Sequence, residues 1–216
     1  ASSTGQGKNV VLAAGSTSGA SSDGGSVQLE SGASSVSSGG SVVVSTAGAS
    51  ESGAVEISSG TSTSTKGSGG LTITSGASSS GSGGSVTIEA GRGDAESGGQ
   101  VSVSAGATQD GGQGGRLIMK SGESVTGSSG AVQVSSGNEL STAGSSGTVH
   151  MTTGQSKSGS SGGLDVNSGA SSSGSGGDVI VRAGSGDEGS GASLTVVAGS
   201  TDSAKEDEGS LDLSSG

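Results

Sequence analysis

The sequence has no cysteine, no proline and no aromatic residue among its 216 residues. Without cysteine, neither a disulfide framework nor a thiolate metal site can form. Without aromatic side chains, the chain lacks the stacking platforms that single-stranded nucleic acids commonly use. The eight basic residues are scattered and the net charge is −11, which also argues against nucleic-acid binding, because that function needs clustered Lys and Arg.

Long hydrophobic runs are missing as well. No apolar segment approaches the length of about 20 residues that a membrane-spanning helix needs, and no signal-peptide pattern is present. Val, Ile and Leu together are fewer than the glycines, of which there are 49. That composition is typical of a disordered Gly/Ser linker, because so little apolar surface cannot offset the entropy of the chain. An ordered fold therefore requires that the few aliphatic residues be placed regularly.

The aliphatic residues are placed regularly, in a short phrase that occurs fourteen times at an average spacing of roughly 15.5 residues. In Gly83–Gly91 the phrase is Val86-Thr87-Ile88, and alternation along an extended strand would place Val86 and Ile88 on one face. The second apolar residue always follows two positions after the first. The phrases begin at Val10, Val27, Val42, Val55, Leu71, Val86, Val101, Leu117, Val132, Val149, Leu164, Val179, Leu194 and Leu211.

Glycine flanks these phrases at two constant positions. It stands two residues before the start of twelve phrases and five residues after the start of thirteen. Glycine at the end of a strand permits either a positive φ angle or a close approach of two backbones. The pattern predicts extended segments joined by Gly/Ser-rich turns.

We predict an all-β fold, a parallel β-solenoid (β-helix) without helices. Two phrases per coil are expected, because a single row of Val and Ile would have no apolar row to face. The spacings favour this pairing. The interval from the start of an even-numbered phrase to the start of the next phrase is nearly constant, whereas the interval from the start of an odd-numbered phrase varies. The prediction is a flattened two-sheet coil of about 31 residues, repeated about seven times from fourteen V-x-[VIL] strands. Residues 1–216 would form one domain, either a segment of a longer array or a stacking unit.

The outward positions of the two predicted sheets differ in charge. One of fourteen is charged in the sheet that begins with Val10, against six of fourteen in the sheet that begins with Val27. The small, uncharged face is the candidate surface for lateral packing or for binding ice. Its residues are Val11, Ala13, Val43, Ser45, Thr72, Thr74, Ser102, Ser104, Gln133, Ser135, Asn167, Thr195 and Val197.

No residue pattern supports a reaction, a cofactor or a metal site. His150 is the only histidine, and a solvated surface position explains it better than a catalytic triad. Arg92-Gly93-Asp94 matches a tripeptide that cell-surface receptors bind, but the tripeptide arises easily by chance in a chain with 49 Gly. The run Lys205–Glu208 is interpreted as a solvated charged loop. We therefore expect no enzyme and no catalytic, cofactor-binding or metal-binding residue.

The tandem pattern, as in Gly83–Gly91 and Gly176–Gly184, resembles Ser/Gly-rich tandem-repeat β-solenoid proteins of unicellular algae and related protists. The resemblance covers nearly the whole chain. It implies an extracellular, non-catalytic role and assigns no functional residues.

These features favour a structural protein, secreted or on the cell surface, that forms a stiff rod, filament or coat. The expected partners are further copies of the chain, packed end to end, laterally or both. The alternative is an ice-binding or surface-binding protein that uses the uncharged face, where Thr72, Thr74 and Thr195 are suggestive. Neither a nucleic-acid partner nor a membrane span is expected.

Overall fold

The computed structural model describes residues 7–19, 22–94, 97–141, 144–187, 189–200 and 209–214. Within these ranges no residue belongs to a helix or to a β-strand. The chain divides into two units, Ala1–Val103 and Ser104–Gly216, and both consist of the same local element. The prediction of a parallel β-solenoid of fourteen strands is therefore wrong for the part of the chain that the structure describes.

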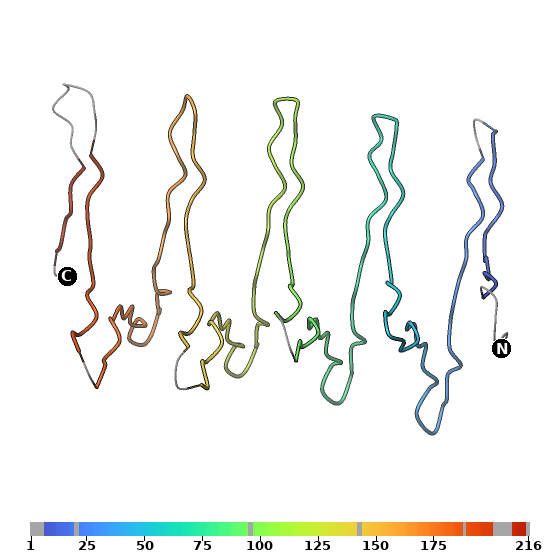
Figure 1. Ribbon diagram of the computed structural model, residues 1–216, viewed down its shortest axis with the longest axis horizontal. Coiled ribbons are helices and arrows are strands. Elements are labelled where there is room, and N and C mark those ends of the chain that lie inside the picture. Colours follow the sequence, from blue (N-terminus) through green and yellow to red (C-terminus); the bar gives the residue numbers. More distant parts are fainter. Residues whose placement is uncertain are drawn as a thin grey trace. The chain divides into compact units, whose positions relative to one another are not determined.

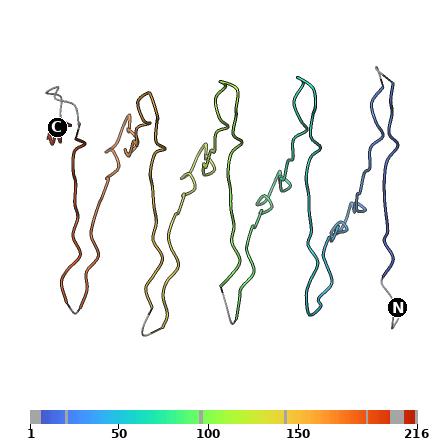
Figure 2. The ribbon, with the colours of Figure 1, turned by 45° about the horizontal axis from the view of Figure 1, so that its top comes forward.

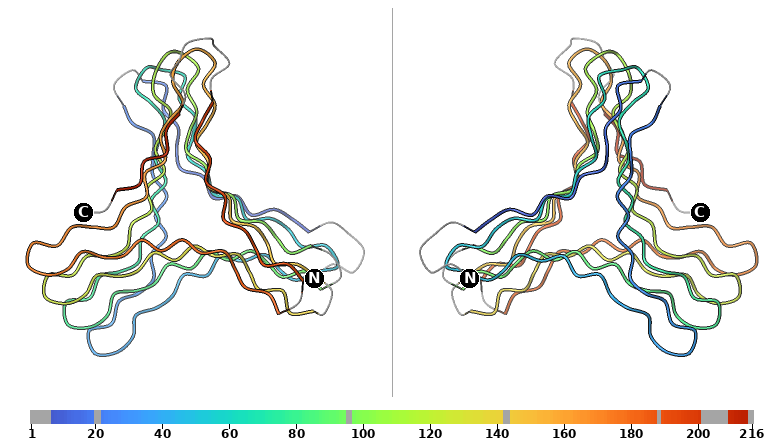
Figure 3. Two further views of the ribbon diagram at one scale, coloured as in Figure 1. Left: turned by 90° about the vertical axis from the view of Figure 1, so that its left-hand side faces the viewer. Right: turned by 90° about the vertical axis from the view of Figure 1, so that its right-hand side faces the viewer.

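The local element is a loop that reverses the direction of the chain. At each connection the end of one phrase and the beginning of the next leave the loop as neighbouring extended legs (Figure 1). The same loops can be followed from other directions in Figures 2 and 3. In the part of the chain that the structure describes, the Gly/Ser-rich connections are thus loops, and the aliphatic phrases are the extended segments that join them.

Backbone hydrogen bonds close several loops at the base. In each of them the glycine two residues before a phrase donates its N–H to the carbonyl oxygen of the glycine that follows the preceding phrase, at 2.8 to 3.0 Å. We call this glycine pair the neck of the loop. The bonded pairs, donor first, are Gly25 and Gly15, Gly40 and Gly32, Gly84 and Gly76, Gly99 and Gly91, Gly115 and Gly106, Gly130 and Gly122, and Gly209 and Gly199.

The phrases themselves are not paired with one another. Among the described residues, every backbone–backbone hydrogen bond joins positions no more than ten apart, and none involves a phrase such as Val86–Ile88. A β-ladder needs successive bonds between two neighbouring extended segments. A single backbone bond at each neck does not provide them, and this is the physical reason why the extended phrases are not strands.

The aliphatic rows have no partner either. No described residue is buried, and the two apolar side chains of one phrase, Val86 and Ile88, are 52% and 74% exposed. The shared aliphatic core predicted between two facing sheets is therefore wrong, because no second apolar row covers the first. The described part of the chain is held by contacts within loops and not by a hydrophobic interior.

Candidate functional site

The necks are the best-defined polar contacts of the loops. At one of them the Gly84 amide donates to the Gly76 carbonyl oxygen at 3.0 Å, and the Ser75 hydroxyl donates to the Gly84 carbonyl oxygen at 2.8 Å. The loop between Gly32 and Gly40 repeats the arrangement, with Ser31 in the place of Ser75. Two hydrogen bonds therefore fix the base of these loops, one from the backbone and one from a side chain.

The necks also explain why glycine precedes the phrases. A Cβ added to Gly84 would lie 3.1 Å from the Cβ of Ser75, and one added to Gly99 would lie 3.1 Å from the Cβ of Ala90. In eleven loops the added carbon would meet the side chain of this facing residue at 3.1 to 3.9 Å. The facing residue, four positions after the start of a phrase, is Ala, Ser or Thr in all fourteen phrases. The requirement at the neck is close backbone approach.

The residues four positions after the start of a phrase are also the least exposed of the described residues. Five of them are partly buried, and every other described residue is exposed. The five are Ser31, Ala90, Ser121, Ser136 and Ala198. The invariably small residue at this position was a signal in the sequence that would have located the necks.

Positive φ angles occur elsewhere in the loops. Among the described residues they are confined to three glycines, Gly67, Gly111 and Gly189, with φ of 80°, 67° and 84°. None of the three is a neck glycine. A Cβ there would strain the backbone, because L-residues rarely adopt this region.

The loop tips carry a second recurring hydrogen bond. Seven residues after the start of a phrase a serine hydroxyl accepts the N–H of the residue three positions on, as when Gly81 donates to Ser78 at 2.9 Å. A serine side chain that bonds the backbone in this way replaces a backbone turn. The same bond, at 2.9 to 3.1 Å, links Ser37 to Ser34, Gly127 to Ser124, Gly159 to Ser156 and Gly174 to Ser171.

Four of these five serines recur every third phrase. Ser34, Ser78, Ser124 and Ser171 follow the second, fifth, eighth and eleventh phrases, and Ser156 is the additional case. The connections that follow those four phrases are equal in length. The repeat thus contains three phrases, and the predicted coil of two phrases is wrong. The serine seven residues after the start of the second, fifth, eighth and eleventh phrases was the sequence signal for this longer period.

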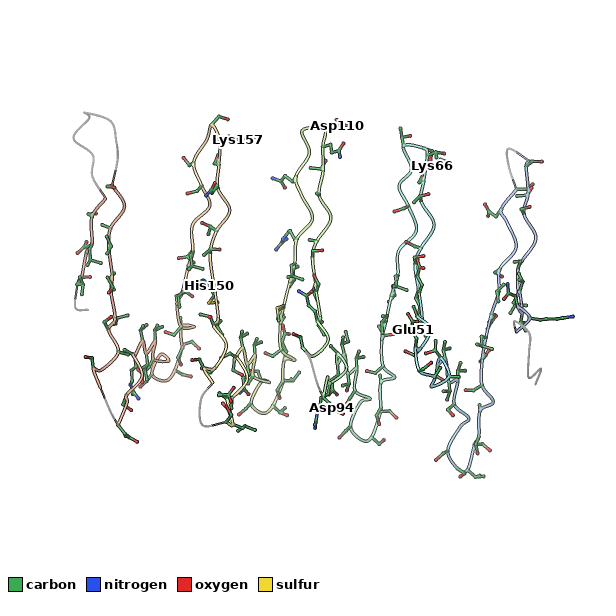
Figure 4. The ribbon with its side chains drawn as sticks, viewed as in Figure 1. Glu51, Lys66, Asp94, Asp110, His150 and Lys157 are labelled. Atoms are coloured by element: carbon green, nitrogen blue, oxygen red, sulfur yellow. The ribbon has the colours of Figure 1, made fainter. Side chains whose placement is uncertain are left out.

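The charged side chains of the described residues are exposed. Figure 4 places Lys66, Asp110 and Lys157 at the tips of their loops and His150 on an extended leg. Arg92 and Asp94 of the receptor-type tripeptide form an ion pair with each other, 2.9 Å between Nη2 and Oδ1, with 88% and 85% of their side chains exposed. An ion pair this exposed contributes little to stability.

One carboxylate is tied into its own loop. Glu139 Oε1 accepts the backbone N–H of Ser141 at 2.7 Å. Hydrogen bonds from the Ser141 side chain, first, and from the backbone of Ser141 lower the pKa of the Glu139 carboxyl. Glu139 occupies the position where other loops have the capping serine, so a carboxylate serves as the cap here.

The candidate face for lateral packing or ice binding does not coincide with one kind of phrase. All thirteen of its side chains are exposed. In the three-phrase repeat, however, Val11, Thr72 and Val43 belong to the first, second and third phrase, so the face draws on all three. Its role stays a prediction.

The described residues contain no group of three or more His, Asp or Glu side chains that could hold a metal ion. In the same part of the chain, no helix is long and apolar enough to cross a membrane. The acidic run Lys205–Glu208 lies outside the described residues. The described part of the chain thus consists of loops closed at their necks and of aliphatic phrases that pair with no other phrase.

No known protein family, no curated protein and no solved structure matches the chain.

Proposed function

We propose that the protein is a structural, non-catalytic repeat protein that works by assembling with copies of itself into a rod, filament or coat outside the cell. The observation that carries the proposal is the exposure of all fourteen aliphatic phrases. Their first and second apolar positions, such as Val132 and Val134, remain 55% and 63% exposed in the single chain. A regular apolar array with no internal partner is what an assembling protein presents to other molecules.

The exposed area supports assembly. The chain of 19.5 kDa exposes 21187 Å², whereas a compact monomer of this mass exposes about 8,500 Å². A specific, stable interface needs only about 1,200 to 2,000 Å² in total. The surplus therefore accommodates several such interfaces on each chain.

The energetics of the loops point in the same direction. Ordering one residue costs about 1 to 2 kcal/mol of conformational entropy, and one intramolecular hydrogen bond contributes about 0.5 to 1.5 kcal/mol net. The loop between Gly91 and Gly99 is closed by one backbone bond over nine residues. Contacts with other molecules are thus needed to hold the repeat in one conformation.

The location outside the cell rests on the resemblance to Ser/Gly-rich tandem-repeat proteins, and the form of the assembly rests on the tandem repeat. Similar phrases repeated along the whole chain suit a scaffold that is built from many copies of the chain. Immunogold labelling of the source cells tests the location directly. Label confined to the cytoplasm would contradict it.

The test of assembly is sedimentation velocity of the purified full chain over a range of concentrations, followed by negative-stain microscopy of the heavy fraction. The proposal predicts a concentration-dependent shift to large, regular particles. A chain that sediments as a monomer at every concentration would contradict it.

Ice binding is the second candidate function. It is favoured by the exposed threonines of a single phrase, Thr72 and Thr74. An ice-recrystallisation assay with the full chain distinguishes it from the first proposal. A double Thr72→Lys, Thr74→Lys variant that leaves recrystallisation unchanged would exclude this phrase as the ice-binding surface.

A further inference from the structure

We infer that the partner which covers the aliphatic phrases is a further copy of this chain, joined to them along their backbone edges, with the necked loops outside the contact. The inference rests on the proposed assembly and says which part of the chain makes it. Fourteen phrases per chain would then serve as repeated pairing sites.

The backbone of the phrases is available for pairing. In the described part of the chain, no N–H or C=O group of a phrase takes part in a backbone–backbone hydrogen bond. Extended segments with free donors and acceptors are templates for pairing with another chain. The apolar side chains of the same segments, such as Leu71 and Ile73 at 57% and 66% exposed, would lose their contact with water in the same step.

The devices that normally prevent such pairing are scarce. Proteins protect exposed edges with proline, with lysine and with bulges. The chain contains no proline, and Lys120 is the only lysine that lies within or directly after a phrase. Within the phrases the only charges are the middle carboxylates of three of them, Glu56, Asp165 and Asp212. The remaining eleven phrases carry no charged side chain that would oppose contact with another extended chain.

The spacing of the phrases identifies the partner. The intervals between phrases are unequal, as the longer step from Val10 to Val27 and the shorter one from Val42 to Val55 illustrate. Any molecule that covers the phrases together must offer apolar segments at the same intervals and in the same order. A second copy of this chain meets that condition at all fourteen phrases.

The loops are poorer candidates for the contact. Their bases are already bonded at the necks, and their tips are bonded by side chains such as Ser78. Their tips also carry exposed charges, Lys66 and Asp110 among them (Figure 4). Bringing like charges of two copies together at the tips would oppose association.

The experiment compares two charge-matched double variants of the full chain. Leu71→Lys with Ile73→Lys places two cations on a phrase, and Ser79→Lys with Ser80→Lys places two on the neighbouring loop tip. We expect the phrase variant to raise the concentration needed for assembly about tenfold or more, since two buried aliphatic side chains are lost. The loop variant should assemble as readily as the parent chain or more readily.

Spin labels locate the contact independently. Because the chain has no cysteine, Thr72→Cys and Ser79→Cys each provide one attachment point, on the phrase and on the loop tip. Spin–spin broadening between copies is expected to be stronger at position 72, within the contact, than at position 79, outside it. Equal loss of assembly in both double variants, or broadening at position 79 alone, would overturn the inference and leave the proposed function standing. A parent chain that never assembles would overturn both.

Discussion

The amide of Gly99 donates a hydrogen bond to the carbonyl oxygen of Gly91 at 2.8 Å, across the base of a nine-residue loop. The two glycines differ in the space around their Cα atoms, which is crowded at Gly99 and open at Gly91. A Cβ on Gly99 would lie 3.1 Å from the Cβ of Ala90 and 3.3 Å from the Gly91 nitrogen, whereas a Cβ on Gly91 would meet nothing within 4 Å. The donor glycine of the neck is therefore required by contact, and its acceptor partner is not.

Replacement of the donor glycine should open the neck. We expect Gly99→Ala to increase the hydrogen-exchange rate of the residue 99 amide about 2- to 10-fold, the equivalent of one lost hydrogen bond. Gly91→Ala is the matched control, because it adds the same methyl group to open space. NMR-detected exchange of the full chain measures both. Equal effects of the two variants would show that contact at Ala90 does not decide the position.

Removal of a capping hydroxyl should loosen a loop tip without opening its neck. In Ser78→Ala the Gly81 amide loses its acceptor, and we expect about 0.5 to 1 kcal/mol of local destabilisation. Ser79→Ala, one residue further along the same tip, is the control. Exchange at Gly81 should accelerate only in the first variant, while exchange at Gly84 should not change. Acceleration at both amides in Ser78→Ala would indicate that tip and neck open together.

Assembly should strengthen as the salt concentration rises. Each chain carries a net charge of −11, so copies repel one another until counterions screen them. We expect the weight-average sedimentation coefficient at a fixed protein concentration to increase between about 0.01 M and 0.5 M NaCl, over which the Debye length falls from about 30 Å to below about 8 Å. Dissociation on addition of salt would instead identify ion pairs as the principal contact.

The loop capped by Glu139 should be weakened by acid. Hydrogen bonds from Ser141 lower the pKa of the Glu139 carboxyl in the folded loop below its value in the unfolded chain. Their stabilisation is therefore present above the unfolded pKa and is lost as the pH falls through the folded pKa. A carboxyl-detected NMR titration should show the depressed pKa in the parent chain and a higher one in Ser141→Ala. An identical pKa in both proteins would exclude the hydroxyl as its main cause.

The extended phrases and the turns between them follow from sequence alone, but their pairing does not. The alternation in Val86–Ile88 and the flanking glycines mark where the described chain has extended segments and loops, although none of the extended segments is the strand that the alternation predicted. The spacing also suggested that two apolar rows would face each other within one coil. The hydrophobic pattern indicates that a row of apolar side chains needs a second apolar surface to cover it, but it does not indicate which chain supplies that surface. In the described part of this chain, no other phrase covers the row.

The period of the repeat was predictable and was assigned incorrectly. Apolar positions recur in every phrase, so they contain no information about how many phrases make one repeat. The loops contain that information, because the capping serines Ser34, Ser78, Ser124 and Ser171 recur three phrases apart. The small residue facing each neck was equally visible. The reason why this residue is small is visible only in the structure, where a Cβ on Gly84 would lie 3.1 Å from the Cβ of Ser75.

Hydrogen exchange of the phrase amides, before and after assembly, tests the central claim most directly. In dilute full chain the amides of Val86–Ile88 should exchange at nearly the rate of an unstructured peptide, because they have no backbone partner. In the assembled protein the same amides should slow by about tenfold or more, since copies of the chain then supply the partners. Strong protection of these amides in the dilute monomer would contradict the account, because it would require pairing within a single chain.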